Sequence, residues 1–130
     1  TTTYAGETLS LAAARATLDV LRDEPVLDHL WTMGARLRDG LDAAIADLHL
    51  DARTYGLPPA VQIRFGDDPE TDERARHVFF RELYRRGIFA SQPFLLSYAH
   101  QPADIDEALA AMHEAFAAVA EDLASLSSSH

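Results

Sequence analysis

The residues of this chain that could support metal, nucleophilic or acid–base chemistry follow no recognisable catalytic spacing. Its six histidines share no H-x-x-x-H pattern, and no carboxylate pair joins two of them into a metal motif, so we predict no metal site. Ser10, Ser91 and Ser97 lack a G-x-S-x-G setting, which disfavours a serine nucleophile. The acidic run at 67–73 lacks the alternating ligands of a calcium loop, so we interpret it as a solvated loop and helix start.

One histidine has a distinctive setting. His100 ends a predicted strand, LLSYAH, immediately before a predicted helix. Polar groups often gather at such a junction, near a ligand or an interface. Two interpretations stay open: His100 contributes to a ligand site, or it hydrogen bonds to local backbone, which is the more common role.

The chain begins TTTYAGETLSLAAA, with hydroxyl residues directly ahead of a predicted helix. A helix N-terminus carries unpaired N–H groups and a partial positive charge, and threonine hydroxyls ahead of it can donate to phosphate oxygens. Simple N-capping is the alternative explanation. On local chemistry alone, capping is favoured.

Composition excludes several function classes. All eleven basic residues are arginines, so a reaction that needs an internal lysine Schiff base cannot run on this chain alone. The absence of cysteine excludes disulfides and thiolate chemistry and favours a cytoplasmic location. The formal net charge of −10 disfavours nucleic-acid binding. No apolar run approaches the roughly 18 residues that span a bilayer, so we expect no membrane partner.

Hydrophobic periodicity predicts the elements that must position these residues. Apolar residues that recur at three and four positions predict helices at 7–23, 26–48, 71–86 and from 103 onward, the third capped by Thr71 or Asp72. Alternating residues predict strands at 52–55, 61–65, 88–90 and 95–99. The order ααββαββα predicts an α+β fold, with a small antiparallel sheet of three to four strands covered by helices on one face.

Two helices carry further information. The helix at 7–23 has one narrow polar stripe, formed by Arg15, Asp19 and Arg22, and a helix of this kind is usually buried on several sides. We therefore predict a dimer or higher oligomer that hides its apolar surface. In the helix at 26–48, Gly34 lies on the apolar stripe, where close helix packing would account for it.

Two longer blocks of sequence carry a family resemblance. TTYAGETLSLAAARATLDVL contains a Thr-aromatic-small-Gly turn that leads into an Ala-rich helix, and RRGIFASQPFLLSYAHQPADIDEAL contains a Gly-initiated strand, a Ser-rich turn, S-x-A-H and a D-I-D helix start. Both resemble class III pyridoxal-phosphate aminotransferases, in particular the glutamate-1-semialdehyde aminomutase-like branch. The two blocks lie at opposite ends of the chain in the family's order. The resemblance therefore covers nearly all 130 residues.

The resemblance implies that the chain is the C-terminal domain of a longer enzyme, an aminotransferase (a transferase) or an aminomutase (an isomerase). That enzyme would transfer an amino group from a small donor through a lysine-bound aldimine. The cofactor lysine would lie upstream, so this chain alone would be inactive and bind no pyridoxal 5'-phosphate. Its partners would be the large cofactor-binding domain and the second subunit of a homodimer. Residues 1–24 would connect to the large domain, 25–126 would form the small domain, and 127–130 would be a disordered tail.

The resemblance also implies site residues. Thr3, with Thr2 beside it, matches the threonine that binds the cofactor phosphate across the dimer interface. Ser91, Gln92 and His100 would lie near the substrate entrance. No residue of this chain would be catalytic, because the Schiff-base lysine is absent from it.

Departures from the family's pattern leave the activity open between aminotransferase and aminomutase. Glu7-Thr8 follows the turn's glycine where the family commonly has Asn-Pro, and residues 91–94 contain no glutamate.

A hypothesis from another class also stays open. The chain could be a free-standing α+β module that assembles through its helices and needs no cofactor. The regular apolar stripe at 27–48 and the apolar helix at 7–23 support this hypothesis, although both also suit a domain that packs on a larger one. A lysine shortly upstream in the coding sequence would favour the enzyme.

Overall fold

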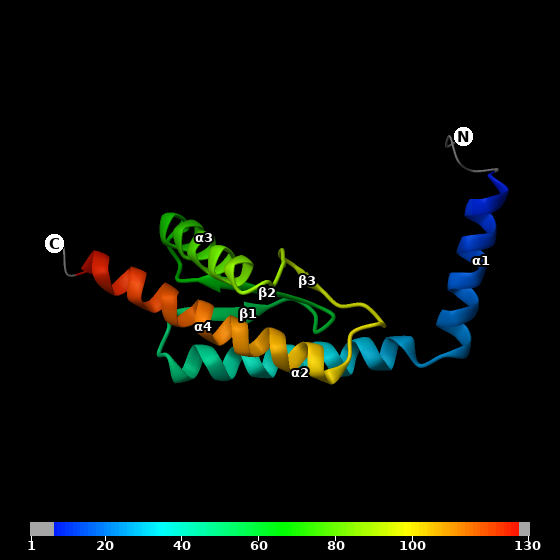
Figure 1. The fold of residues 1–130 in the computed structure, drawn as a ribbon, viewed down its shortest axis with the longest axis horizontal. Helices are drawn as coiled ribbons and strands as arrows, with labels where there is room; N and C mark the ends of the chain where they lie inside the picture. The colour runs from blue at the N-terminus through cyan, green and yellow to red at the C-terminus, as the bar shows by residue number, and fades with distance from the viewer. Residues whose placement is uncertain (1–6, 128–130) are drawn as a thin grey trace.

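The computed structural model describes residues 7–127 (Figure 1). Within that range the elements in chain order are α1 (Thr8–Asp23), α2 (Val26–Asp47), β1 (Ala52–Tyr55), β2 (Ala60–Phe65), α3 (Pro69–Arg85), β3 (Phe94–Leu95) and α4 (Pro102–Ser127). The predicted α+β class, with a small antiparallel sheet and covering helices, is confirmed. The predicted order ααββαββα contains one strand too many.

The three strands form an antiparallel sheet in the order β1-β2-β3. The central strand shows why period two predicted it correctly. Val61, Ile63 and Phe65 are fully buried, and the residues between them are half-buried. One face of β2 therefore packs into the core, as expected for a sheet that helices cover on one side.

The core lies between that face and the helices. Phe65 of β2, Phe79 of α3 and Phe116 of α4 are fully buried, and their rings form one cluster. The ring centroids of Phe79 and Phe116 are 4.8 Å apart, and those of Phe65 and Phe79 are 5.9 Å apart. These distances fall in the favourable range for aromatic pairs. The cluster joins three elements that are far apart in sequence.

The cap of α3 differs from the prediction. The helix begins at Pro69, and the residue that caps it is Asp68 instead of Thr71 or Asp72. Asp68 Oδ2 accepts hydrogen bonds from Thr71 N at 2.9 Å and Thr71 Oγ1 at 2.8 Å. Proline is well suited to the first helical position because it lacks an N–H there, which moves the start two residues earlier.

The predicted strand at 88–90 is wrong, because the end of α3 uses its backbone. Gly87, with φ +82°, donates its N–H to Tyr84 O, and Ile88 donates its N–H to Leu83 O, both at 3.0 Å. These two bonds form a Schellman motif. The Ile88 N–H therefore bonds the end of the helix and is not available to a neighbouring strand. An alternating pattern of only three residues is too short to distinguish a strand from such a helix end.

The predicted strand at 95–99 is also too long. β3 ends at Leu95, although Leu96 still donates its N–H to Pro59 O at 3.1 Å. The chain then turns, and His100 N donates to Ser97 O at 3.2 Å. The turn precedes α4 directly, so the extended segment has no room to continue.

Gly34 is required by close packing, but the neighbour is a turn and not a helix. A Cβ at Gly34 would lie 2.1 Å from Pro58 O and 2.2 Å from Pro58 C. Because these are backbone atoms of the loop between β1 and β2, they cannot move aside as a side chain can. The glycine lets α2 approach that loop directly.

Helix α1 projects from one end of the molecule and stands away from the sheet and the other helices (Figure 1). It contains no buried residue, so this chain does not bury the helix on several sides as its composition predicted. Its exposed apolar residues are Leu9, Leu11, Leu18, Val20 and Leu21. Two members of the predicted polar stripe, Asp19 and Arg22, form an ion pair at 3.0 Å.

At the other end, α4 ends at Ser127, which is the first residue of the expected tail at 127–130. Residues 128–130 of the predicted tail lie outside the described range. None of the helices within the described residues is long and apolar enough to cross a membrane.

Candidate functional site

A cavity of ≈ 510 Å³ lies between the chain leading into β3 and the first turns of α4. Its volume is typical of small-molecule sites, which span roughly 300–1,000 Å³. Its lining comprises Leu37, Ile88, Phe89, Ala90, Ser91, Pro93, Phe94, Leu95, Leu96, His100, Asp104, Ile105, Glu107, Ala108 and Met112.

The cavity brings together two of the three residues predicted near a substrate. Ser91 and His100 both line it, although they come from opposite sides of β3 in sequence. The two other polar lining residues are Asp104 and Glu107, both on α4. No motif in the sequence pointed to Asp104 or Glu107 as site residues. Acidic residues are common at a helix start, because they interact favourably with the positive end of the helix dipole.

Gln92 is turned toward the sheet instead of lining the cavity. Its Oε1 accepts a hydrogen bond from the backbone N–H of Ile63 at 3.3 Å. Its Nε2 is buried and has no hydrogen-bond partner among the described residues. The contact attaches the turn before β3 to the central strand, which positions the neighbouring Ser91.

His100 lines the cavity, and its ring also bonds local backbone, which is the more common of the two roles considered for it. The backbone N–H of Ser97 donates to His100 Nδ1 at 3.0 Å, so the ring does bond local backbone. Because Nδ1 accepts in this bond, the ring proton of the neutral imidazole belongs on Nε2. A cavity-lining His100 held in this way offers an N–H donor and not an acceptor.

His100 is also anchored to the start of α2. His29 Nε2 lies 2.8 Å from His100 O, and since a carbonyl oxygen only accepts, His29 is the donor. The rings of His29 and Tyr98 meet edge to face with centroids 5.2 Å apart. A hydrogen bond with Glu24 raises the pKa of the Tyr98 hydroxyl, and burial raises it further by a smaller amount. No spacing in the sequence pointed to these contacts, because His29 and His100 are separated by most of the chain.

The two carboxylates of the cavity differ in their surroundings. Asp104 Oδ2 accepts a hydrogen bond from the backbone N–H of Gln101 at 2.7 Å, and it lies in the first turn of α4. That position at the positive end of the helix dipole partly offsets its charge. Glu107, one turn further on, is exposed, and no side-chain hydrogen bond or ion pair involves it within the described range.

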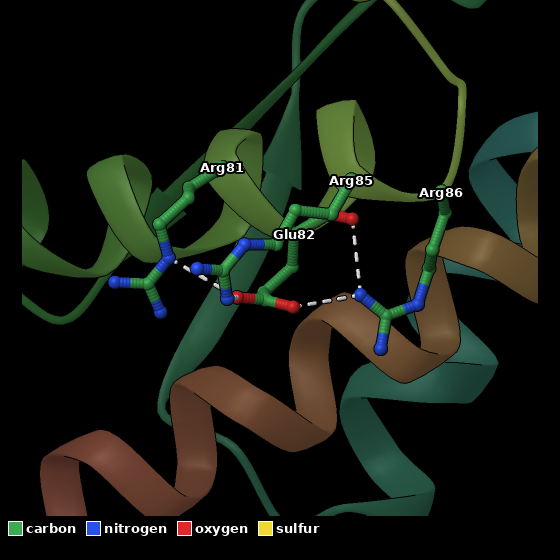
Figure 2. Close-up of polar contacts among 4 residues, drawn as sticks. All are labelled: Arg81, Glu82, Arg85 and Arg86. Carbon is green, nitrogen blue, oxygen red and sulfur yellow. Dashed lines mark hydrogen bonds and ion pairs between the residues drawn. The ribbon is translucent and has the colours of Figure 1, made fainter.

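A second polar cluster lies at the end of α3, away from the lining of this cavity (Figure 2). Glu82 is 8% exposed and accepts from Arg81 Nε at 3.1 Å, Arg85 Nη1 at 3.0 Å and Arg86 Nη1 at 2.8 Å. Hydrogen bonding to Arg86 is the largest of the effects that lower the Glu82 pKa. The guanidinium of Arg86 also donates to Glu82 O at 3.0 Å. The cluster secures the last turn of α3, whose C-terminal end favours cations.

Thr2 and Thr3 lie outside the described residues, so the structure places neither of them. Across residues 7–127, no group of three or more His, Cys, Asp or Glu side chains is arranged to hold a metal ion.

The chain is similar to known proteins. It is 37% identical over 119 residues to an aminopentol aminotransferase from Sphingopyxis macrogoltabida, which covers 89% of this chain and 28% of that protein. It is 32% identical over 120 residues to a glutamate-1-semialdehyde 2,1-aminomutase from Methanococcoides burtonii, covering 84% of this chain and 28% of that protein. No family model matches the chain.

Solved structures agree. The FumI protein of a Sphingopyxis species, in its PLP internal aldimine form, has a TM-score of 0.79 and 35% sequence identity and covers 88% of this chain. The chain is homologous to the C-terminal part of pyridoxal-phosphate aminotransferases and aminomutases. An ω-transaminase from Sphaerobacter thermophilus shares the fold, with a TM-score of 0.61, 20% identity and 71% of this chain covered.

This homology supports the aminotransferase interpretation over the free-standing module. The chain spans about 28% of the length of the curated aminotransferase and aminomutase it matches.

The residues of this chain could contact a bound pyridoxal phosphate, but they could not form its covalent bond to the protein. The sequence contains no lysine that could bond the cofactor. In the polar lining of the cavity, Ser91 and His100 could each donate a hydrogen bond to a phosphate, but Asp104 and Glu107 would repel its negative charge and no arginine lines the cavity to offset them.

Proposed function

We propose that this chain is the C-terminal part of a pyridoxal-phosphate enzyme that transfers an amino group, as an aminotransferase or an aminomutase. Its cofactor lysine would lie upstream of the chain. The observation that carries the proposal is the homology, which extends over 89% of the chain and joins it to proteins named for these two activities. The cofactor supplies the electron sink that stabilises a carbanion next to nitrogen.

The residues of this chain orient the substrate. The cavity beside β3 would form the wall of the substrate entrance that the small domain provides. Ser91 would offer a hydroxyl, and His100 would offer its Nε2–H, held in direction by the Ser97 bond to Nδ1. Gln92 would act indirectly, because it fixes the turn that carries Ser91.

The N-terminal residues would complete the cofactor site. We assign Thr3, with Thr2 beside it, to the cofactor phosphate of the other subunit in a homodimer. Helix α1 would pack on the large cofactor-binding domain, since it contains no buried residue and its Leu9, Leu11 and Leu18 are largely exposed in the described part of this chain. The 130-residue chain alone would therefore be inactive.

The test is amino transfer by the full-length gene product loaded with pyridoxal phosphate. The donors should include aminopentol and glutamate 1-semialdehyde, which are named for the Sphingopyxis and Methanococcoides relatives. We expect activity with the full-length protein and none with the 130-residue chain. Turnover by the short chain alone, or none by the full-length protein with any donor, would contradict the proposal.

Variants test the cavity separately. Ser91→Ala and His100→Phe should each lower kcat/KM, by about tenfold for the loss of one substrate hydrogen bond. His113→Phe is the matched control, because His113 does not line the cavity and instead pairs with Asp47 at 3.1 Å. Equal effects of His100→Phe and His113→Phe would remove His100 from the site.

A further inference from the structure

We propose that the cavity beside β3 selects the substrate, by accepting the aliphatic chain of an amine and rejecting a chain that ends in a carboxylate. The inference rests on the proposed function, because it takes the cavity to face the substrate. It goes further by naming the substrate class: long-chain aliphatic amines without a second anionic group.

The lining of the cavity is mostly apolar and suits an aliphatic chain. Leu37, Ile105 and Met112 are 2%, 3% and 3% exposed, and together with the buried Phe94 they form its apolar lining toward the core. All lining residues except Ser91, His100, Asp104 and Glu107 are apolar. A chain that enters exchanges water for this lining, which is the main source of affinity for aliphatic groups.

The outer edge of the cavity extends the same surface. Phe89 is 87% exposed and Leu95 is 70% exposed, and both line the cavity. Because these two side chains are exposed, they could contact the part of a long aliphatic substrate that extends beyond the interior of the cavity. The apolar surface therefore continues from the core to the rim.

The charges of the cavity decide which chain end is accepted. Asp104 and Glu107 are its charged lining residues, and none of the chain's arginines lines it. Asp104 is already satisfied by the Gln101 N–H, whereas Glu107 has no partner within residues 7–127. A terminal carboxylate would therefore meet like charge without a cation to pair with, and like-charge contacts are strongly disfavoured.

The test compares amino donors that differ in one property at a time, on the full-length protein loaded with pyridoxal phosphate. Octylamine against butylamine varies chain length, and octylamine against 8-aminooctanoate varies only the far end. Because each buried methylene contributes about fourfold, we expect kcat/KM for octylamine to exceed that for butylamine on the order of 100-fold. We expect 8-aminooctanoate to be at least about tenfold poorer than octylamine.

Two variants assign these preferences to the cavity. Ala108→Phe places a ring in the lining and should remove the advantage of octylamine over butylamine. Ala110→Phe is its control on the exposed side of α4, outside the lining. Glu107→Arg changes the charge at an exposed position and should reverse the order of octylamine and 8-aminooctanoate. It tests the proposal even if Ala108→Phe fails to fold.

Calorimetric titration with octylamine and octanoate separates this inference from the proposed function. We expect octylamine to bind and octanoate to bind at least about tenfold more weakly, with Ala108→Phe abolishing octylamine binding. Amino transfer without chain-length or end-group preference would overturn the cavity assignment and leave the proposed function standing. Binding that Ala108→Phe abolishes, with no amino transfer from any donor, would support the cavity assignment and overturn the proposed function.

Discussion

His29 Nε2 lies 2.8 Å from the carbonyl oxygen of His100, so the start of α2 holds a residue near the end of the β3–α4 connection. The same His29 ring meets Tyr98 edge to face. The start of α2 is therefore linked to the segment that carries His100, a residue of the cavity lining. His29 is a positioning residue for His100, and substitutions there test the linkage.

His29→Ala should lower the free energy of unfolding by about 1–2 kcal/mol, since it removes one half-buried hydrogen bond and one aromatic contact. His29→Gln keeps a donor at similar reach and should recover part of that loss. Urea unfolding of the chain measures both. Tyr98→Phe keeps the ring and should cost less than His29→Ala; a larger cost would mean that the Tyr98 hydroxyl, and not His29, anchors the turn.

Glu82→Gln should change how stability depends on pH. The three arginines lower the Glu82 pKa in the folded state below its value in the unfolded chain. A carboxyl of this kind stabilises the fold at pH values above its unfolded pKa, about 4.3, and loses that contribution as the pH falls through the lower folded pKa. We expect the wild type to be more stable at neutral pH and the difference to shrink toward acid.

Unfolding measured from about pH 7 to pH 3 shows this convergence. Glu114→Gln is the control, because Glu114 is exposed on α4 and no side-chain hydrogen bond or ion pair involves it within residues 7–127. A wild-type advantage over Glu82→Gln that stayed constant across this range would contradict the ion-pair explanation.

Gly34→Ala should destabilise the fold by about 2 kcal/mol or more, because the new methyl group meets Pro58 backbone at 2.1 Å. Gly40→Ala is the matched comparison in the same helix. Its nearest neighbour is the Cδ1 atom of Leu109 at 2.4 Å, at the end of a side chain that can rotate. We expect a cost below about 1 kcal/mol there, partly offset by better helix propensity. Equal costs would mean that the β1–β2 loop yields as easily as a side chain.

Phe116→Ala should cost about 3–5 kcal/mol, because it removes the ring that contacts both Phe65 and Phe79 in the core. Phe89→Ala should change stability by no more than about 0.5 kcal/mol, since Phe89 is 87% exposed. Chemical denaturation of the two variants, side by side, checks this. A large loss at Phe89 would place that ring in the core, and not at the rim of the cavity.

Thr3→Val in the full-length enzyme should weaken pyridoxal-phosphate binding by about tenfold, the effect of one hydrogen bond to a charged group. Thr3→Ser should keep most of the affinity, because it retains the hydroxyl. Cofactor titration of the apoenzyme measures both. Unchanged affinity in Thr3→Val would assign the phosphate contact to another residue, with Thr2 the next to test.

The sequence alone determined much of this protein. Periodicity at three and four positions identified all four helices, and alternation at Val61, Ile63 and Phe65 identified the central strand, because side-chain direction in these elements follows from local backbone geometry. The two quoted sequence blocks pointed to the aminotransferases and aminomutases to whose C-terminal part the chain is homologous. Ser91 and His100 were expected near one site and line one cavity.

Tertiary structure decided the rest. The Schellman motif at Gly87 took the Ile88 N–H that a strand would have used, and Asp68 capped α3 ahead of Thr71. Chain reversal brought Asp104 and Glu107 beside residues 88–96, so the cavity's charge depends on contacts between distant segments. Helix α1 shows most clearly what the sequence alone could not predict. Its composition predicted burial on several sides, but only the packing of the described residues showed that none of its residues is buried in this chain.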